Sequence, residues 1–368
     1  MKKIILFLLF PLSIYSQTID QSLDAAKRKI ASRNYIEAKA DLSKLVETNP
    51  KNKNAYTLRG RARMGLQDYY GAIGDFNFAL EIDSTLAEAF NFRGEAKINL
   101  GDFEDSILDL DKAIKFNSNY SEAYTNRGFA KDNLEDFQGA YFDFSKAIDI
   151  GPVDKQKYVN RALIKTELDE FVSAIDDYNK ALEFDKNDAN LFNFRGVAFY
   201  NTSNFEKAIA DYDQAIKLDP KDPLKYENRA LAKTAKEDLK GALEDYNKSL
   251  ELDNQDSETF NLRGVLKHTM QDYDGAILDY SKAIEVDASN PTYFDNRALS
   301  KTAKEDYAGA IDDYTSSIEL YPTDSETYYQ RALVKLTMNN NYDGCLDLKR
   351  AEELGSSEAK TAIKKNCK

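Results

Sequence analysis

The sequence is poor in the residues on which most enzymes and metal proteins depend. Its 368 residues include one histidine, two cysteines and no tryptophan. This composition nearly excludes a metal site with histidine or thiolate ligands and a catalytic triad built on histidine. Glycine-rich phosphate loops and the H-E-x-x-H, C-x-x-C and G-x-S-x-G motifs are also missing. We therefore predict that the protein is not an enzyme and uses no metal or other cofactor.

Basic residues are outnumbered in this chain. Lys and Arg total 50 against 63 Asp and Glu, which gives a net charge of −13 and an isoelectric point near 4.9. A surface that binds nucleic acid must be basic to meet the phosphates, so we expect no nucleic-acid partner. The length exceeds that of one ordinary hydrophobic core, which predicts several domains or a repeat array.

The first seventeen residues have the three parts of a secretory signal peptide. Lys2 and Lys3 precede a short apolar run over residues 4–10, and cleavage is expected after Ser16 or Gln17. The run is too short to span a membrane comfortably, and no later segment comes close, so we expect no transmembrane span after the signal is removed. The alternative is an uncleaved N-terminal anchor. Export would place the protein in the periplasm, at the outer membrane or outside the cell.

A repeat of 34 residues runs through almost the whole chain. Arginine recurs nine times at this spacing, each time followed by Gly or Ala and preceded by an aromatic residue three positions earlier. Aspartate recurs ten times on the same period. Such regularity identifies a repeat architecture. The two rows are Arg59, Arg93, Arg127, Arg161, Arg195, Arg229, Arg263, Arg297 and Arg331, and Asp41, Asp75, Asp109, Asp143, Asp177, Asp211, Asp245, Asp279, Asp313 and Asp347.

Each repeat has the pattern of two helices joined by a polar turn. The first helix carries its recurrent residues on one face, as the spacing of Phe90, Gly94 and Lys97 shows. After the turn, Asp or Asn precedes an aromatic residue, as in Asp68-Tyr69, where the N-cap of a second helix belongs. The second helix carries alanine four positions before an aromatic residue, and a proline or a polar equivalent ends it.

These features resemble the tetratricopeptide repeat over about residues 19–356. Tyr or Phe replaces the usual Trp, Arg replaces the usual Leu, and Lys mostly replaces the usual Tyr. The resemblance implies an all-α, right-handed superhelical solenoid of antiparallel helix pairs, whose concave face, lined by the first helices, typically binds peptides or partner proteins. We expect a signal peptide at 1–17, about ten repeats over 18–356 that start near 19, 53, 87, 121, 155, 189, 223, 257, 291 and 325, and a C-terminal capping helix at 357–368.

The arginine and aspartate rows lie on helix faces that should be packed. A buried guanidinium without a partner is very costly, so we predict a structural ladder of arginine–aspartate pairs. Asp41 persists although its own repeat has Ala25 in place of arginine, which favours pairing between one repeat's second helix and the next repeat's first, as Asp41 with Arg59. The alternative is an arginine row that binds anionic ligands.

The stripe of the first helices that should face the groove is rich in asparagine and acidic residues. An asparagine amide both donates to and accepts from a peptide backbone. The alternative is that these amides bond to neighbouring helices. Arg61 is the only base on this stripe, so we expect a neutral or basic polypeptide, unless the lysine row from Lys97 to Lys335 turns inward. The candidate groove residues are Asn91, Asn126, Asn160, Asn193, Asn228, Asn261, Asn296, Phe129, Tyr200, Tyr329, Glu88 and Glu95; His268 is expected to be a surface imidazole.

Cys345 and Cys367 are an even pair in a chain that we expect to be exported, which permits a disulfide. Cys345 precedes the turn near Gly355 by about as many residues as Cys367 follows it. In an antiparallel hairpin of helices the two cysteines would therefore lie opposite each other. Such a bridge would stabilise the chain by about 3 kcal/mol. The alternative is one buried thiol and one frayed terminal thiol.

Together these features predict a non-catalytic scaffold that binds a polypeptide through many weak polar contacts along a rigid concave surface. A module that binds a glycan or envelope polymer, or that assembles an envelope complex, is the alternative. Exposed aromatic residues and many Asn and Asp side chains would serve glycan binding.

Overall fold

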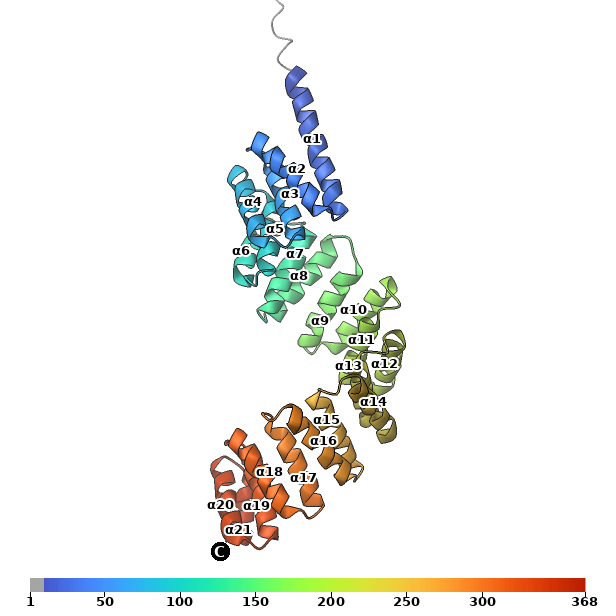
Figure 1. Ribbon diagram of the computed structural model, residues 1–368, viewed down its shortest axis with the longest axis vertical. Helices are drawn as coiled ribbons and strands as arrows, with labels where there is room; N and C mark the ends of the chain where they lie inside the picture. The colour runs from blue at the N-terminus through green and yellow to red at the C-terminus, as the bar shows by residue number, and fades with distance from the viewer. Residues whose placement is uncertain (1–9, 368) are drawn as a thin grey trace, which may run out of the picture. The chain divides into compact units, whose positions relative to one another are not determined.

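The structure is a computed structural model that describes residues 10–367, with side chains from residue 18 onward. Within these residues the chain forms 21 α-helices and no β-strand (Figure 1). The predicted signal peptide, residues 1–17, lies outside the part of the chain whose side chains are described. None of the described helices is both long and apolar enough to cross a membrane.

The helices follow one another in antiparallel pairs, so the predicted all-α fold of helix pairs is confirmed. The first helices of the pairs are α1 (Phe10–Ala31), α3 (Lys53–Gly65), α5 (Ala87–Ile98), α7 (Ser121–Asn133), α9 (Lys155–Glu167), α11 (Ala189–Asn201), α13 (Pro223–Ala235), α15 (Ser257–Thr269), α17 (Pro291–Ala303) and α19 (Ser325–Thr337). The second helices are α2 (Tyr35–Thr48), α4 (Tyr69–Ile82), α6 (Phe103–Phe116), α8 (Phe137–Ile150), α10 (Phe171–Phe184), α12 (Phe205–Leu218), α14 (Leu239–Leu252), α16 (Tyr273–Val286), α18 (Tyr307–Leu320) and α20 (Asn341–Glu353). The last helix, α21 (Ser357–Asn366), follows the tenth pair.

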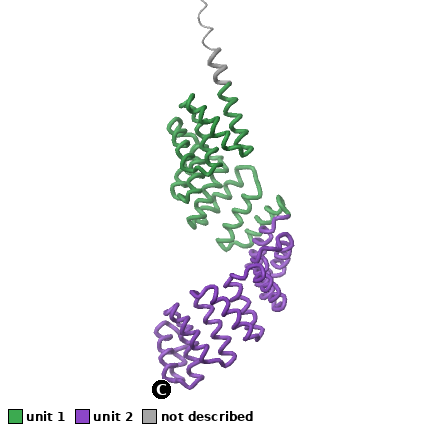
Figure 2. Tube along the Cα trace, viewed as in Figure 1, with its two compact units in different colours: residues 1–186 green, residues 187–368 purple. Residues whose placement is uncertain are grey.

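The chain divides into two compact units (Figure 2). Unit 1 extends to residue 186 and contains α1–α10, and unit 2 begins at residue 187 and contains α11–α21. Inside each unit every helix pair packs against the next pair along the chain, so each unit is a stack of repeats.

A residue in the left-handed backbone conformation ends the first helix of each repeat. At Gln67, with φ of 61°, the backbone N–H groups of Gln67 and Asp68 donate to the carbonyls of Met64 and Arg63 and close the helix. The Asp68 carboxylate then accepts the N–H of Gly71 and caps the second helix. These contacts turn the chain back within a few residues, so the two helices of a repeat lie antiparallel.

The core of each repeat consists of small residues on the first helix that receive an aromatic or leucine side chain from the second. Tyr280 on α16 is almost fully buried, and a Cβ atom added to Gly264 on α15 would lie 2.6 Å from its ring. Ala230 replaces glycine in the repeat before it and is also fully buried. The glycine or alanine after each arginine therefore sets how closely the two helices approach.

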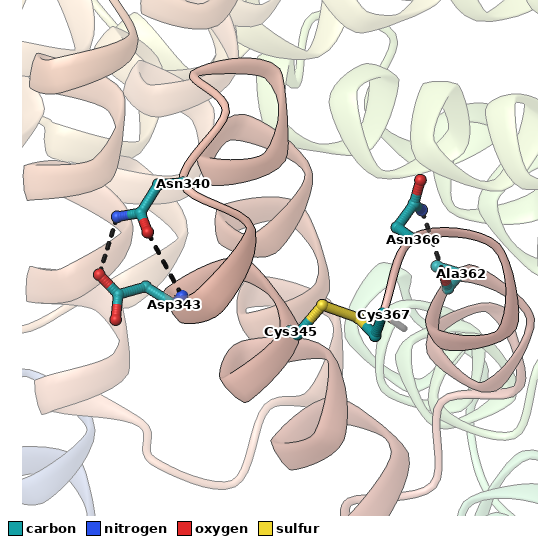
Figure 3. Close-up of a disulfide and its surroundings, with 6 residues drawn as sticks. All are labelled: Asn340, Asp343, Cys345, Ala362, Asn366 and Cys367. Atoms are coloured by element: carbon teal, nitrogen blue, oxygen red, sulfur yellow. Dashed lines mark hydrogen bonds between the residues drawn. A yellow bond between two sulfur atoms is a disulfide. The ribbon is translucent and has the colours of Figure 1, made fainter.

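The end of the chain is tied to the last repeat by a disulfide between Cys345 on α20 and Cys367, which directly follows α21 (Figure 3). The two Cα atoms lie 5.7 Å apart. Ser356 caps α21 by accepting the N–H of Ala359, and Ala359 is buried in a cluster with Leu348 of α20. The final helix thus covers the apolar end of the repeat stack.

Candidate functional site

Within each unit the first helices lie on the inner side of the stack. Successive first helices contact one another directly, as α3 does with α5 and α5 with α7 in unit 1, and α11 with α13 in unit 2. No two successive second helices of the described chain come equally close. A stack whose first helices are closer together than its second helices curves toward the first helices. We call the exposed side of these first helices the inner face.

The predicted asparagine rows join neighbouring first helices to each other. Asn126 Nδ2 donates to Asn91 Oδ1 at 3.0 Å, across the contact of α7 with α5. In unit 2, Asn228 donates to Asn193 at 3.0 Å and Asn296 donates to Asn261 at 2.8 Å. Asn91, Asn193 and Asn261 are buried.

The remaining member of these rows, Asn160, is also buried, and its Oδ1 accepts a hydrogen bond from Gln156 at 2.7 Å. Gln156 lies on the same helix, α9, so only the three asparagine pairs follow the alternative weighed from the sequence, contact with a neighbouring helix. Contact of these amides with a bound peptide stays a prediction.

Two acidic clusters in unit 2 repeat at a spacing of 68 residues. The Thr259 hydroxyl on α15 contacts the carboxylates of both Glu227 on α13 and Asp256. Burial raises the pKa of Glu227, and the negative charges of Asp256 and Glu258 add to the rise.

The second cluster has the same design. The Thr327 hydroxyl lies 3.2 Å from Asp295 and 2.6 Å from Asp324. Burial raises the pKa of Asp295 to about 6, and the charge of Asp324 acts in the same direction. Both clusters lie where one first helix meets the next, so they place carboxyl groups on the inner face.

Unit 1 also places carboxyl groups on this face. Burial raises the pKa of Glu95 on α5, against the attraction of Arg61 on α3. On α7 burial raises the pKa of Asp132, and the charge of Glu167 on α9 adds to the rise. Glu88 is exposed, with a carboxylate oxygen 3.7 Å from an Arg61 nitrogen. The inner face of this unit is therefore acidic, and the carboxyl groups of Glu95 and Asp132 are poorly solvated.

A pocket of about 300 Å³ opens on the inner face at the start of unit 1. Its walls come from α1 to α5, and they combine aromatic rings with an arginine and a glutamate. The residues around it are Ile30, Tyr35, Arg61, Met64, Gly65, Tyr69, Phe92, Glu95 and Asn99.

The three predicted apolar anchors are half-buried. Phe129 packs edge-on against Phe144 with ring centroids 5.4 Å apart, Tyr200 lies 5.4 Å from Phe205, and Tyr329 packs on the apolar cluster at the end of unit 2. His268, which we expected to be a surface imidazole, is half-buried. Its Nδ1 lies 2.7 Å from the Ser300 hydroxyl, and its ring stands edge-on to Tyr273.

All nine arginines of the repeat bind the aspartate sixteen residues later, on the second helix of the same repeat. In Arg161, for example, Nε donates to one Asp177 oxygen at 2.8 Å and Nη2 to the other at 2.6 Å. The guanidinium also lies over the aromatic ring three residues earlier, with distances of 5.4–5.9 Å along the row. The aspartates from Asp75 to Asp347 are buried.

The pairing differs from the predicted one of Asp41 with Arg59. Arg59 binds Asp75 of its own repeat, because the second helix of each repeat packs directly along the first. Asp41 instead binds Lys29 of its own repeat at 2.7 Å. Lys29 therefore explains why Asp41 persists in a repeat that lacks the arginine.

The lysine row does not turn toward the inner face. Lys165 Nζ lies 2.8 Å from the Asp177 oxygen that also accepts from Arg161 Nε. The same contact recurs at 2.7–2.8 Å for Lys97, Lys131, Lys233, Lys267, Lys301 and Lys335. Sequence reasoning missed this role, although the lysines stand four residues after the arginines, on the same helix face.

Comparisons with known proteins agree with the repeat architecture. Models of the tetratricopeptide repeat match residues 87–120, 189–222 and 257–290. The C-terminal part of a TPR repeat-containing protein from Cytophaga hutchinsonii is similar in structure, with 20% identity, coverage of 65% of this chain and 97% of that chain, and a TM-score of 0.54. A tetratricopeptide repeat protein from Parabacteroides merdae has 19% identity, covers 67% of this chain and 96% of that chain, and gives a TM-score of 0.51. No curated protein matches the chain.

At these identities the structural likeness shows the fold alone. The chain carries tetratricopeptide repeats, and its helix pairs stack as they do in solenoids of that repeat.

Proposed function

We propose that this protein is a non-catalytic interaction scaffold that binds a neutral or basic polypeptide along the inner face of its repeats. The tetratricopeptide repeat is typically a protein-interaction module, and the stacked first helices provide an extended surface for such a partner. The preference for positive charge rests on one observation, the placement of the basic residues. The arginine and lysine rows are bound to buried aspartates, so they do not balance the carboxyl groups of the inner face.

The electrostatic argument follows from where the charges lie. Glu88, Glu122 and Glu258 are exposed on first helices, whereas Arg61 on the same side is held by Glu88 and Phe92. A surface of one sign attracts an oppositely charged partner and repels a like one, and salt weakens both effects. Association with a basic polypeptide should therefore weaken as the salt concentration rises.

The test measures binding of the full chain to fluorescent peptides of one length in acidic, neutral and basic versions. We expect the basic peptides to bind best, the acidic ones least, and salt to reduce the difference. Replacing Glu88 and Glu122 on the inner face by lysine should abolish the preference. Replacing Glu81 and Glu104, which are exposed on second helices, by lysine is the matched control and should leave it intact. Preferential binding of acidic peptides, or equal effects of both pairs, would refute the proposal.

We further propose that the protein is exported to the cell envelope through removal of residues 1–17. The disulfide between Cys345 and Cys367 supports this, because such bonds persist in oxidising compartments. N-terminal sequencing of the protein recovered from cell fractions tests the idea. We expect an envelope or extracellular fraction whose chain begins at Gln17 or Thr18. An intact Met1 in the cytoplasmic fraction would show that it is wrong.

A further inference from the structure

The pocket at the start of unit 1 has a composition unlike the rest of the inner face. Tyr35, Tyr69 and Phe92 provide three aromatic rings, and Met64 provides a flexible apolar side chain. The volume of about 300 Å³ is at the small end for a ligand site and suits one long side chain.

Glu95 supplies the carboxylate of this pocket, and Arg61 attracts it without a hydrogen bond between them. Its carboxylate is mostly buried and accepts no hydrogen bond from any donor in the described chain. Burial accordingly raises its pKa, which shows that the ionised carboxylate is poorly stabilised there. A carboxylate that is removed from water and has no hydrogen bond is stabilised by any cation that reaches it.

Arg61 does not fill that role, because other groups hold its guanidinium. It lies 4.6 Å from the centroid of the Phe92 ring and 3.7 Å from a Glu88 carboxylate oxygen. Glu122 on α7 adds a further negative charge nearby, since Glu88, Glu95, Glu122 and Arg61 all act on the phenol of Tyr120. Three carboxylates and one arginine therefore act on this phenol, and the charge near the pocket is negative.

We propose that this pocket receives the cationic side chain, lysine or arginine, of a bound polypeptide. The aliphatic part of that side chain would lie along Met64 and the rings of Tyr35 and Tyr69, because aromatic rings attract a cation. Its charged end would donate to the Glu95 carboxylate. The way Arg61 lies between Phe92 and Glu88 shows that this corner of the repeat already accommodates a guanidinium.

The inference rests on the proposed function and sharpens it, because it names the side chain that one position of the inner face selects. The methionines allow a direct test in the full chain. Only four are present, Met1, Met64, Met270 and Met338, and Met64 alone lines the pocket. In protein labelled with ¹³C at the methionine methyl groups, Met64 therefore reports on the pocket, and Met270 and Met338 in unit 2 are internal references.

The probes are Nα-acetyl-lysine methylamide, its neutral isostere Nα-acetyl-norleucine methylamide, and the acidic Nα-acetyl-glutamate methylamide. We expect the lysine probe to shift the Met64 signal in a saturable way and to bind about tenfold more tightly than the norleucine probe, a difference of about 1.4 kcal/mol. The signals of Met270 and Met338 should not move. Glu95→Gln should reduce the affinity of the lysine probe to that of norleucine, whereas the matched control Glu104→Gln on α6 should not.

The other outcomes overturn the inference in distinct ways. Equal binding of the lysine and norleucine probes would show an apolar pocket without charge selection. Tighter binding of the glutamate probe would identify Arg61 as the anchor and an anion as the guest. No shift of Met64 with any probe would show that the pocket takes no side chain. The result is independent of the peptide measurements, because the chain can fail to bind every long peptide and still show the lysine-dependent shift.

Discussion

At the scale of single residues, most ladder aspartates are shared by two cations. Asp177 accepts from Arg161 at 2.6 and 2.8 Å and contacts Lys165 at 2.8 Å, and its own side chain is 4% exposed. A buried carboxylate that loses every partner destabilises a fold strongly, whereas one that keeps a cation does so less. The two cations should therefore act as partial substitutes for each other.

This sharing predicts that substitutions of the two cations are not additive. Arg161→Ala alone should lower the free energy of unfolding by about 2 kcal/mol, and Lys165→Met alone by about 1 kcal/mol or less. The double variant should lose about 4–5 kcal/mol, more than the sum, because Asp177 is then buried without a cation. Denaturant unfolding of the four proteins measures the coupling. An unchanged melting temperature in Arg161→Ala, or strict additivity, would refute the shared ladder.

In the acidic cluster around Asp295, two carboxyl groups share one hydroxyl. The Thr327 hydroxyl lies near both Asp295 and Asp324, yet a hydroxyl has one proton to donate. When both carboxylates are ionised, only one of them can therefore accept a hydrogen bond from Thr327. If the other carboxyl is protonated, it can itself donate to the hydroxyl oxygen, and both contacts are then hydrogen bonds. This agrees with the pKa of Asp295, which burial raises to about 6.

The raised pKa predicts a pH-dependent effect of Asp295→Asn. The folded chain holds the Asp295 proton more tightly than the unfolded chain, whose aspartate pKa is about 3.8, so the wild type loses stability as the pH rises from about 4 to about 6. Asparagine never ionises, so the variant should gain about 2 kcal/mol relative to wild type between pH 4 and pH 7.5, allowing for partial exposure. Denaturant unfolding at both pH values measures this. The exposed Asp312→Asn is the control, and an equal gain there would exclude the cluster as the cause.

For the arginine–aspartate ladder, the sequence predicted that the charges pair but not which aspartate each arginine binds. Charged rows on packed helix faces predict internal pairing, because unpaired buried charges are too costly. The choice between Asp41 and Asp75 as the partner of Arg59 depends on how far the side chain reaches between two helices, which a periodic pattern does not specify. The repeat pattern likewise did not identify Lys29 as the partner of Asp41, which the contact between their side chains in the structure shows.

At the scale of helices, the turn inside each repeat is strained in nearly every copy. Ten residues at a spacing of 34 adopt positive φ, and only one of them, Gly101, is a glycine. Glu237, with φ of 64°, is exposed, and its backbone N–H still donates to the Thr234 carbonyl at 2.9 Å. The left-handed conformation costs a residue other than glycine about 1–2 kcal/mol.

This strain predicts that Glu237→Gly stabilises the protein. The free energy of unfolding should rise by about 0.5–1 kcal/mol, since glycine adopts the left-handed conformation without cost but loses more chain entropy on folding. Glu244→Gly is a matched control, because it removes the same exposed side chain from inside α14, where glycine should cost about 1 kcal/mol. Thermal unfolding compares the two. A loss of stability in both variants would contradict the prediction.

The helices themselves follow closely from the repeat pattern. Pro223 and Pro291 occupy the start of their helices, and capping residues such as Asp68 stand where the spacing places them. The inner-face clusters could not be derived in the same way. Thr259 and Glu227 stand 32 residues apart on different repeats, so their contact depends on how closely α15 approaches α13.

At the scale of the whole molecule, the ladder changes how the net charge of −13 is distributed. Taken alone, the nine arginines and ten aspartates of the two rows carry nearly equal and opposite charge. Because lysines join them in most repeats, the ladder carries a surplus of positive charge. The rest of the surface must then be more acidic than the net charge indicates, which strengthens the expectation of a basic partner.

The closing disulfide should have a local effect, because repeats in a stack interact mainly with their neighbours. It links residues 22 positions apart and fixes α21 on α20, for a stabilisation of about 3 kcal/mol. In the double variant Cys345→Ser and Cys367→Ser, hydrogen exchange should show faster exchange in α20 and α21 and unchanged exchange in α11 and α12 of the same unit. A reductant should produce the same change in the wild type and none in the variant. Two free thiols in denatured, unreduced protein, or an equal loss of protection in α11, would contradict this prediction.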